Sequence, residues 1–382
     1  MENGIVKPLK SAPTRRVHQQ DIPAWMLFLT SVVLVLLSSV LALLALLAFF
    51  ALHQRPHSNT FVAFESNQCA HPLVRREWRT LADSEKLDYI AAVQCLQRKP
   101  GITGIHGAKT RFEDFQAVHI VLSEAVHLVG HFLPWHRRLL HAYETALRTE
   151  CAFEGTFPYW DWSEDIDSGL PIAKSPVFDP VFGLGGNGVD IPNYNGQFGN
   201  LTRLESFGWV APGAGGGCVT DGPFAEYQLN TGPGTNITKH CLQRAFNENI
   251  RGFLTGEQVQ AVLEEQSFES FRIRLEGAPV YPTMGLHDAG HNLVGGEMAD
   301  RYSSPGDPVF YLHHAFLDKI WWDWVQMDSA SRITDVSGRS TVEPPFTDIT
   351  LDFELDMLGL VPTVTVREVM DLDSESLCYT YE

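Results

Sequence analysis

Apolar residues are spread unevenly along the chain, and the longest run lies near its start. From Ala24 to Leu52 there is no acidic or basic side chain, and Leu, Val, Ala and Phe dominate. A run of this length can cross a bilayer with some tilt. We therefore predict a membrane anchor at residues 23–52, after a tail at 1–22 and before a polar stem at 53–66. A signal peptide has a shorter apolar region of roughly 7–15 residues, but small residues at Ala48 and Ala51 leave cleavage open.

Residues 67–382 form the second part of the chain, and its first half has apolar residues mainly at helical spacing. One such stretch runs from Cys69 to Leu96, and another from Arg111 to Leu147. Gly130 and Pro134 interrupt the latter. It therefore predicts two helices, with Pro134 in the first turn of the second.

The second half alternates between loops and helices. Pro158 to Gly234 is dense in Gly, Pro, Asn and Asp, which predicts long ordered loops. Phe246 to Leu275 returns to helical spacing, and a helix from Asp307-Pro308 to about Met327 follows. Alternating and β-branched residues at Thr347 to Glu368 predict a few strands. Residues 67–382 are thus expected to be one mainly α domain.

Charge gives the orientation of the anchor. Four basic residues precede the apolar run and only Arg55 follows it closely, so the N-terminus is expected in the cytosol. The rest of the chain is then lumenal or extracellular, where the Asn-x-Thr sequons at Asn200 and Asn236 are glycosylation acceptors. The formal net charge of −18 argues against nucleic acid as a partner.

The six cysteines fit the same compartment, since thiols pair in the secretory pathway. Six cysteines allow about fifteen pairings, and sequence alone does not choose among them. Free buried thiols are the alternative. We expect cysteines that are close in sequence to pair, which gives Cys69 with Cys95 and Cys218 with Cys241. The remaining pair, Cys151 with Cys378, is a guess.

Histidines gather in two regions of helical spacing. Of the 15 histidines, five lie from His119 to His141 and four from His287 to His314. His287 and His291 are four residues apart, which puts both rings on one helix face as a chelating pair. A single histidine is most often an exposed or hydrogen-bonded residue, but two such clusters favour a metal site.

The first histidine region needs a chain break to form a site. His119 and His127 are eight residues apart and can be neighbours two turns apart on a helix. His136 is out of phase with them, and joins only because Gly130 and Pro134 break the helix. No His-Glu-x-x-His motif occurs, and no cysteine lies beside these histidines, so zinc sites lack their usual ligands. Sites built from imidazole alone suit copper.

Four segments resemble the central domain of the tyrosinase family: FQAVHIVLSEAVHLVGHFLPWHRRLLHAYE, PYWDWSED, LHDAGHNLVGG and DPVFYLHHAFLDKIWWDW. The resemblance covers about Cys69 to Glu382. It implies a mainly α fold, in which a four-helix bundle holds a type 3 dicopper centre, with long loops and a few flanking β-strands. It also implies two copper ions as cofactors, O2 as co-substrate, and oxidation of phenols or catechols to o-quinones.

The same resemblance assigns the ligands. In its pattern, His131 and His141 match no ligand position. Helical phase fits either histidine of the pair His313-His314 and cannot choose between them. The family pattern makes the second one the ligand. The implied copper A ligands are His119, His127 and His136, and the implied copper B ligands are His287, His291 and His314.

Three further residues have implied catalytic roles. Glu276 resembles a glutamate that, with the polar residue after the first copper B histidine, holds a water able to take the phenol proton. That polar residue is often Asn in the family, but here it is Asp288, which is itself a possible base. A surface carboxylate is the alternative for Glu276. Asn292 is expected at the substrate entrance or as a helix-end cap.

The resemblance also sets smaller expectations. Ala125 stands where some family members have a cysteine bonded to a histidine, so no thioether is expected. The chain ends soon after Tyr379 and Tyr381, which resemble the motif that closes the central domain, so an open site is expected. Asp318 is a candidate acceptor for a ligand imidazole or a surface ion-pair partner. Five tryptophans are expected in the core: Trp160, Trp162, Trp321, Trp322 and Trp324.

The sequence thus predicts a membrane-anchored copper oxidase of phenols, an o-diphenol oxidase for which monophenol hydroxylation is also possible. The short layout resembles fungal members, which suggests a secondary metabolite or a peptidyl tyrosine as substrate. Two alternatives stay open. One is reversible O2 binding without turnover, as in haemocyanins, and the other is a structural protein that has lost its copper.

Overall fold

The structure, a computed structural model, describes residues 69–192, 194, 214–277 and 279–382. The predicted tail, anchor and stem at residues 1–66 and the sequon at Asn200 lie outside the described residues. Within the described ranges, none of the helices has the length and apolar character needed to cross a membrane. The described residues from Cys69 onward belong to one compact unit, and every structural statement below concerns that unit.

Helices dominate this unit, as predicted. The α-helices of the described residues are α2 (Asp83–Arg98), α3 (Arg111–Val126), α4 (Phe132–Cys151), α5 (Trp162–Asp167), α7 (Gly256–Leu263), α8 (Phe268–Glu276), α9 (Leu286–Val294), α10 (Val309–Met327) and α11 (Ser329–Arg332). The strands are short: β1 (Leu73–Glu77), β2 (Pro158–Tyr159), β3 (Gly188–Asp190), β4 (Gly216–Val219), β5 (Gln228–Leu229), β6 (His240–Cys241), β7 (Glu354–Leu355), β8 (Val364–Thr365) and β9 (Tyr379–Tyr381).

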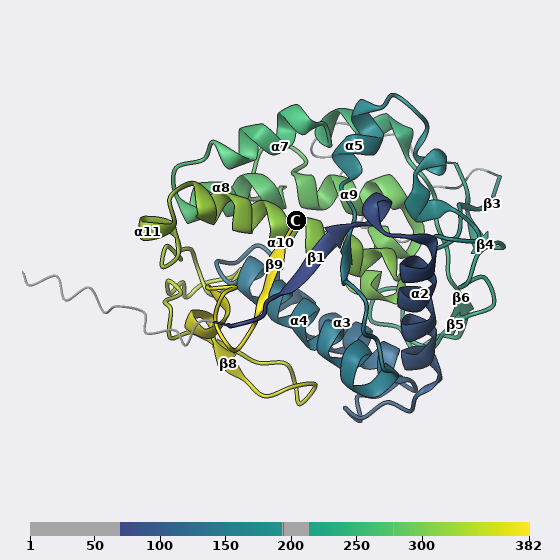
Figure 1. Cartoon of the computed structure of the whole chain (residues 1–382), viewed down its shortest axis with the longest axis horizontal. Helices are drawn as coiled ribbons and strands as arrows, with labels where there is room; N and C mark the ends of the chain where they lie inside the picture. Colours follow the sequence, from purple (N-terminus) through teal and green to yellow (C-terminus); the bar gives the residue numbers. More distant parts are fainter. Residues whose placement is uncertain (1–68, 193, 195–213, 278) are drawn as a thin grey trace, which may run out of the picture. The chain divides into compact units, whose positions relative to one another are not determined.

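Four of these helices form the centre of the domain. Helix α10 packs against α4 and α9, and α3 packs against α4 (Figure 1). Most residues of α10 are buried, as expected for a helix that is apolar all round. The predicted end of α10 at Met327 is confirmed, and the helix begins at Val309 with Pro308 as N-cap, one residue later than predicted. The Asp307 carboxylate accepts a hydrogen bond from the Val309 N–H at 3.0 Å. All five tryptophans expected in the core are buried.

The predicted break between two helices is confirmed between α3 and α4. Thr110 and Glu113 form a reciprocal capping box at the start of α3. Pro134 lies in the first turn of α4, where its missing N–H is tolerated. Gly130 lies in the connection, and a Cβ there would be 2.6 Å from the Ser337 carbonyl oxygen. The break is therefore fixed by a close approach that only glycine permits.

Two of the predicted helices are wrong in extent. The stretch from Cys69 begins with β1 and becomes helical only at Asp83. The predicted helix at Phe246–Leu275 is divided into a 3-10 helix at Glu248–Phe253, then α7, then α8. Thr255 and Ser267 accept main-chain hydrogen bonds as N-caps and start new helices there.

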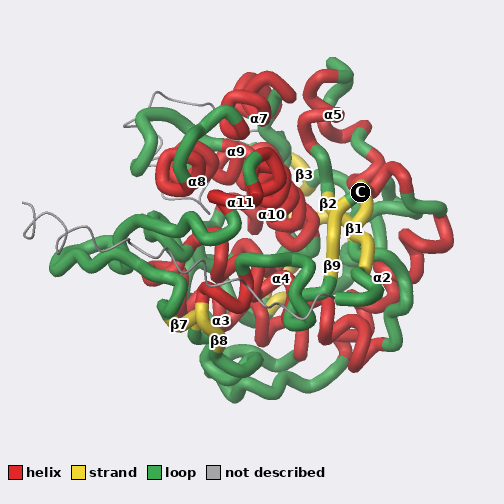
Figure 2. Tube along the Cα trace, turned by 60° about the vertical axis from the view of Figure 1, so that its left-hand side comes forward, coloured by secondary structure: helices red, strands yellow, loops and turns green. Residues whose placement is uncertain are grey.

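The strands join distant parts of the chain. β1 pairs in parallel with β2 and with β9, in the order β2-β1-β9, and these three lie together on one side of the domain (Figure 2). β9 contains the Tyr379-x-Tyr381 motif. In the region predicted to hold strands, β7 and β8 form an antiparallel pair.

Tertiary structure also decides the disulfides. The pair Cys218–Cys241 is confirmed, but the predicted Cys69–Cys95 pair and the Cys151–Cys378 guess are wrong. Cys69 pairs with Cys378, because β1 lies beside β9. Cys95 on α2 pairs with Cys151 at the end of α4, because these helices pack together. All six cysteines are paired, so the free-thiol alternative is wrong.

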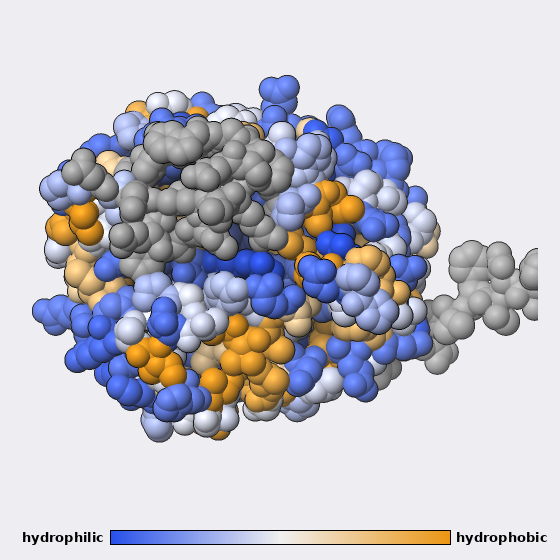
Figure 3. Space-filling view, turned by 180° about the vertical axis from the view of Figure 1, so that it is seen from behind, coloured by the Kyte–Doolittle hydropathy of each residue, from blue (hydrophilic) through white to orange (hydrophobic). Residues whose placement is uncertain are grey.

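The face in Figure 3 is largely hydrophilic, with hydrophobic residues in separate patches. Large apolar side chains with more than half of their surface exposed, such as Ile102, Leu170 and Met327, lie on different segments. This surface agrees with the acidic composition of the chain.

Candidate metal centre

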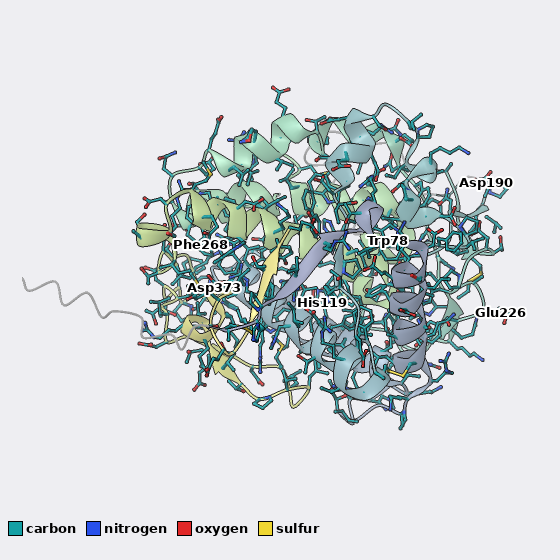
Figure 4. All side chains as sticks on the ribbon, viewed as in Figure 1. Trp78, His119, Asp190, Glu226, Phe268 and Asp373 are labelled. Carbon is teal, nitrogen blue, oxygen red and sulfur yellow. A yellow bond between two sulfur atoms is a disulfide. The ribbon has the colours of Figure 1, made fainter. Side chains whose placement is uncertain are left out.

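Six histidines form two groups inside the central helices. In each group, one ring nitrogen per residue lies within 4.8 Å of the others. His119, labelled in Figure 4, lies in the interior of the domain. All six side chains are buried, with at most 9% of their surface exposed. The groups are His119, His127 and His136, and His287, His291 and His314.

The helices place these rings as the spacing predicted. α3 carries His119 and ends at His127, which is its C-cap. The break after α3 turns His136 on α4 toward both, so that its ring centroid is 5.7 Å from that of His119 and 5.1 Å from that of His127. On α9, the centroids of His287 and His291 are 4.6 Å apart, which fits two rings one turn apart on one helix face.

Main-chain carbonyl groups orient four of the rings. Because a carbonyl oxygen can only accept, each of these rings carries its proton on Nδ1 and keeps Nε2 free for a metal. The contacts are His119 Nδ1 to Tyr302 O at 2.7 Å, His127 to Ser123 O at 2.8 Å, His136 to Phe132 O at 2.8 Å, and His291 to Met298 O at 2.7 Å.

The free nitrogens fit metal ions. The Nε2 atoms of His119, His136 and His287 are buried without a hydrogen-bond partner, which is costly unless a ligand occupies the space between them. The Nε2 atoms of His291 and His314 are 3.1 Å apart, a separation that suits two nitrogens bound to one ion at about 2 Å each. Burial also lowers the pKa of His119 and of His287 to about 3, so their lone pairs stay available at neutral pH.

The two groups also face each other. The rings of His136 and His314 stack with centroids 4.6 Å apart, and those of His127 and His287 are 5.8 Å apart. These six residues could therefore hold two adjacent metal ions. Since all six donors are imidazole nitrogens, the arrangement suits copper better than metals that prefer oxygen or thiolate.

The structure separates His314 from its neighbour His313. His314 belongs to the second group, whereas His313 accepts a hydrogen bond from Trp162 Nε1 at 3.2 Å. His313 also packs against Gly290, where an added Cβ would lie 2.2 Å from its ring. His313 thus fits α10 closely against α9, between the two histidines of that helix.

Glu276 is buried, so the alternative of a surface carboxylate is wrong. Its Oε2 lies 2.7 Å from Arg272 Nη1, and its Oε1 accepts the Leu128 N–H. Burial raises the pKa of Glu276 to about 7, although the Arg272 guanidinium and the Leu128 N–H oppose that rise. Arg272 was missed from the sequence, although its spacing four residues before Glu276 on one helix is a recognisable signal.

Asp288 and Asn292 lie on α9 beside the second group. The Asp288 side chain is 28% exposed, and its Oδ1 is 3.6 Å from His287 Nδ1. Asn292 donates from Nδ2 to the Asp288 carbonyl oxygen at 2.7 Å, one turn earlier on α9, whereas the C-cap of this helix is Gly295. Asp288 therefore has a partly solvent-exposed carboxylate at the metal centre.

Asp318 is neither the acceptor for a ligand imidazole nor a surface residue. It is buried, and its carboxylate binds Arg137 Nε at 2.5 Å and Arg75 Nη1 at 3.3 Å. The hydroxyl groups of Tyr379 and Tyr381 donate to it at 2.7 and 2.6 Å. The ligand imidazoles instead use main-chain carbonyls, which a sequence cannot place.

His131, His141 and Ala125 do not belong to either histidine group. His131 stacks on Phe353 with centroids 4.5 Å apart, and His141 lies near the Tyr379 ring. Both are outside the two groups, as the resemblance implied. Ala125 is exposed, and every cysteine is in a disulfide, so none is available for a thioether to a ligand.

Comparisons with known proteins cover the whole metal centre. Residues 109–327 match the family described as the common central domain of tyrosinase. The tyrosinase-like protein phomQ2 of Diaporthe leptostromiformis is 34% identical over 82% of this chain and 74% of its own length. The N-acetyl-6-hydroxytryptophan oxidase ivoB of Emericella nidulans is 33% identical over 81% of this chain and 92% of its own. A mutant polyphenol oxidase from Thermothelomyces thermophila superposes with a TM-score of 0.74 at 33% identity, over 81% of this chain and 89% of that one.

Proposed function

The chain belongs to the tyrosinase family and is a copper oxidoreductase of phenols, and on this premise we propose that it oxidises o-diphenols to o-quinones with O2. The observation that carries the proposal is the pair of facing histidine groups, each with three nitrogens within 4.8 Å. Two copper ions bound there supply the redox chemistry, in which two o-diphenols lose two electrons and two protons each and one O2 becomes two waters.

The protein's own residues prepare the site for this reaction. Main-chain carbonyls hold the rings of His119, His127, His136 and His291 in fixed orientations, so little reorganisation is needed when the metals bind or change charge. Burial keeps all six imidazoles neutral. The surrounding aromatic rings, such as Phe132 and Phe310, limit the access of water to the ligands.

We further propose that the enzyme hydroxylates monophenols, with Asp288 as the acceptor of the phenol proton. Asp288 is partly exposed and adjacent to His287, whereas Glu276 is fully buried. The proton passes from the phenol oxygen to the Asp288 carboxylate and then to solvent.

The test compares a matched monophenol and diphenol, p-cresol and 4-methylcatechol, by oxygen uptake. Asp288→Asn should lower the p-cresol rate by at least tenfold and the 4-methylcatechol rate by less than threefold. Glu269→Gln is the control, because Glu269 is also a first-turn carboxylate, on α8. An unchanged p-cresol rate in Asp288→Asn would remove Asp288 from the reaction.

We propose a phenol of secondary metabolism, or a tyrosine within a peptide, as the natural substrate. Support comes from the Emericella nidulans relative, whose name gives a hydroxylated tryptophan derivative as its substrate. Comparing kcat/KM for N-acetyl-6-hydroxytryptophan, a tyrosyl peptide and 4-methylcatechol tests this. A preference for 4-methylcatechol over both larger substrates would contradict it.

We also propose that the domain is anchored in a membrane and faces the lumen or the exterior, with glycans at Asn200 and Asn236. The apolar run at 23–52 and the basic residues before it support this. Three disulfides are typical of oxidising compartments. Protease protection of intact microsomes, with glycosidase treatment, tests it, and a digested, unglycosylated domain would contradict it.

A further inference from the structure

We propose that Glu276 is a positioning residue that ties the copper A loop, defined as residues 127–131, to the helix that carries the first copper B ligand. The proposal rests on the proposed copper function of the six histidines. It assigns Glu276 a mechanical role in the placement of the two histidine groups, which the family resemblance does not imply.

The carboxylate of Glu276 reaches directly into the copper A loop. Glu276 is 1% exposed, and its Oε1 accepts the N–H of Leu128, the residue that follows the ligand His127. Its Oε2 is fixed by Arg272 Nη1 at 2.7 Å, one turn earlier on α8. A buried, charge-assisted pair of contacts of this kind is short and directional. Glu276 therefore holds the main chain at the point where the ligand leaves α3.

The copper A loop needs such support because no helix holds it. His127 is the C-cap of α3, and Leu128 has a φ of 63°, a left-handed conformation that costs about 1 kcal/mol or more for a residue with a side chain. On its other side, Leu128 O accepts from Arg339 Nε at 3.3 Å, and Gly130 N donates to Arg339 O at 2.8 Å. The loop is thus clamped between Glu276 and Arg339.

The main chain at the end of α8 lies next to the start of α9, the helix that carries His287. Glu276 is the last residue of α8, and Gly277 follows it with a φ of 99°. A Cβ on Gly277 would lie 2.3 Å from Gly285 N, and one on Gly285 would lie 2.6 Å from Leu275 O. The end of α8 therefore touches the residue that precedes α9, two positions before His287.

Glu276 consequently lies between the two halves of the metal centre. Its side chain fixes the residue after a copper A ligand, and its chain neighbours Leu275 and Gly277 lie against the residue that precedes the copper B helix. One carboxylate oxygen accepts from the Leu128 N–H and the other binds Arg272. The two contacts together fix the direction of the side chain, as a positioning role requires.

The test is Glu276→Gln, which keeps the size of the side chain but removes the charge that binds Arg272. The matched control is Glu144→Gln. Glu144 is also a buried glutamate bound by arginines, to Arg75 at 2.9 Å and Arg148 at 3.1 Å, and it lies on α4 away from the metal ligands. Copper per chain, the rate of copper release to a chelator, Tm, and turnover of p-cresol and 4-methylcatechol are measured for the full-length protein.

Glu276→Gln should release copper at least tenfold faster than the wild type, with one of the two ions lost first. The rates with p-cresol and 4-methylcatechol should fall by the same factor, so that their ratio stays within twofold. Glu144→Gln should lower Tm while keeping two coppers and the wild-type release rate.

Two results would overturn the positioning role. One is a Glu276→Gln protein that keeps two coppers and its 4-methylcatechol rate but loses p-cresol turnover, which assigns Glu276 to proton transfer. The other is equally fast copper release from Glu144→Gln, which reduces the effect to lost stability. A wild-type protein that binds two coppers but oxidises no phenol would refute the proposed function, while the release rates would still decide the role of Glu276.

Discussion

Replacing Asp318 by Asn should destabilise the domain strongly while leaving every copper ligand in place. Although burial raises the pKa of Asp318, the guanidinium groups of Arg137 and Arg75 outweigh it and hold that pKa below its ordinary value. The carboxylate also accepts from two tyrosine hydroxyls of β9. It thus joins α10, α4, β1 and β9. Asn keeps the shape but leaves two buried cations with less compensating charge.

The expected cost follows from these contacts. Breaking a buried ion pair by removing one partner costs roughly 3–5 kcal/mol, because the other charge stays buried. For a domain of this size, each kcal/mol lowers Tm by about 2–4 °C. Asp318→Asn should therefore lower the Tm of the copper-loaded protein by about 6–20 °C. The control Asp323→Asn, which removes a partly exposed pair with Lys319 on the same helix, should cost less than about 1 kcal/mol.

Thermal unfolding and copper analysis of the same samples give a clear outcome. Because Asp318 belongs to a buried network away from the copper ligands, Asp318→Asn should have a much lower Tm but keep two coppers until it unfolds. An Asp318→Asn protein with wild-type stability, or one that loses copper at unchanged Tm, would refute this reasoning and favour a direct link from Asp318 to a ligand imidazole.

Three further predictions concern the metal centre. His314→Ala should lose one copper and all phenol oxidation. His313→Ala should keep two coppers but lose about 1–3 kcal/mol of stability, because Trp162 Nε1 is left without its acceptor. Metal analysis of both variants separates the ligand from the packing residue. Gly290→Ala should reduce copper B occupancy, because the new Cβ would meet the His313 ring at 2.2 Å; full occupancy measured by metal analysis would contradict this. The copper-free protein should lose stability as the pH falls from 6.5 to 5, because His119 and His287 have folded pKa values of about 3 and the unfolded chain takes up protons that the folded one does not. At pH 5, each of these two histidines lowers the free energy of unfolding by about 2 kcal/mol. Urea unfolding at both pH values measures this loss.

Helical spacing predicted that histidines gather in two regions, and the family resemblance assigned the six ligands. His287 and His291 are neighbours on any helix, and the break at Gly130 and Pro134 allowed His136 to lie near His119. The choice between His313 and His314 could not be made in this way, since the phase of α10 fits both. It depends on the contact of His313 with Gly290 and Trp162, which only the packed helices create.

The wrong predictions share one physical cause, which is contact between distant parts of the chain. Cys69 pairs with Cys378 rather than with Cys95, because β1 and β9 lie side by side. Asp318 was expected beside an imidazole or at the surface, but its partners come from β1, α4 and β9. The surroundings of Glu276 likewise depend on the approach of α8 to the copper A loop.

The central claim is that six histidines hold two coppers that oxidise phenols, and its most direct test is the stoichiometry of copper and oxygen in one sample. The copper-loaded full-length protein is supplied with 4-methylcatechol while O2 and o-quinone are followed together. We expect two coppers per chain and continuous turnover, with one O2 consumed for every two quinones formed. Two coppers that bind O2 reversibly without forming quinone, or a protein that retains no copper, would contradict it.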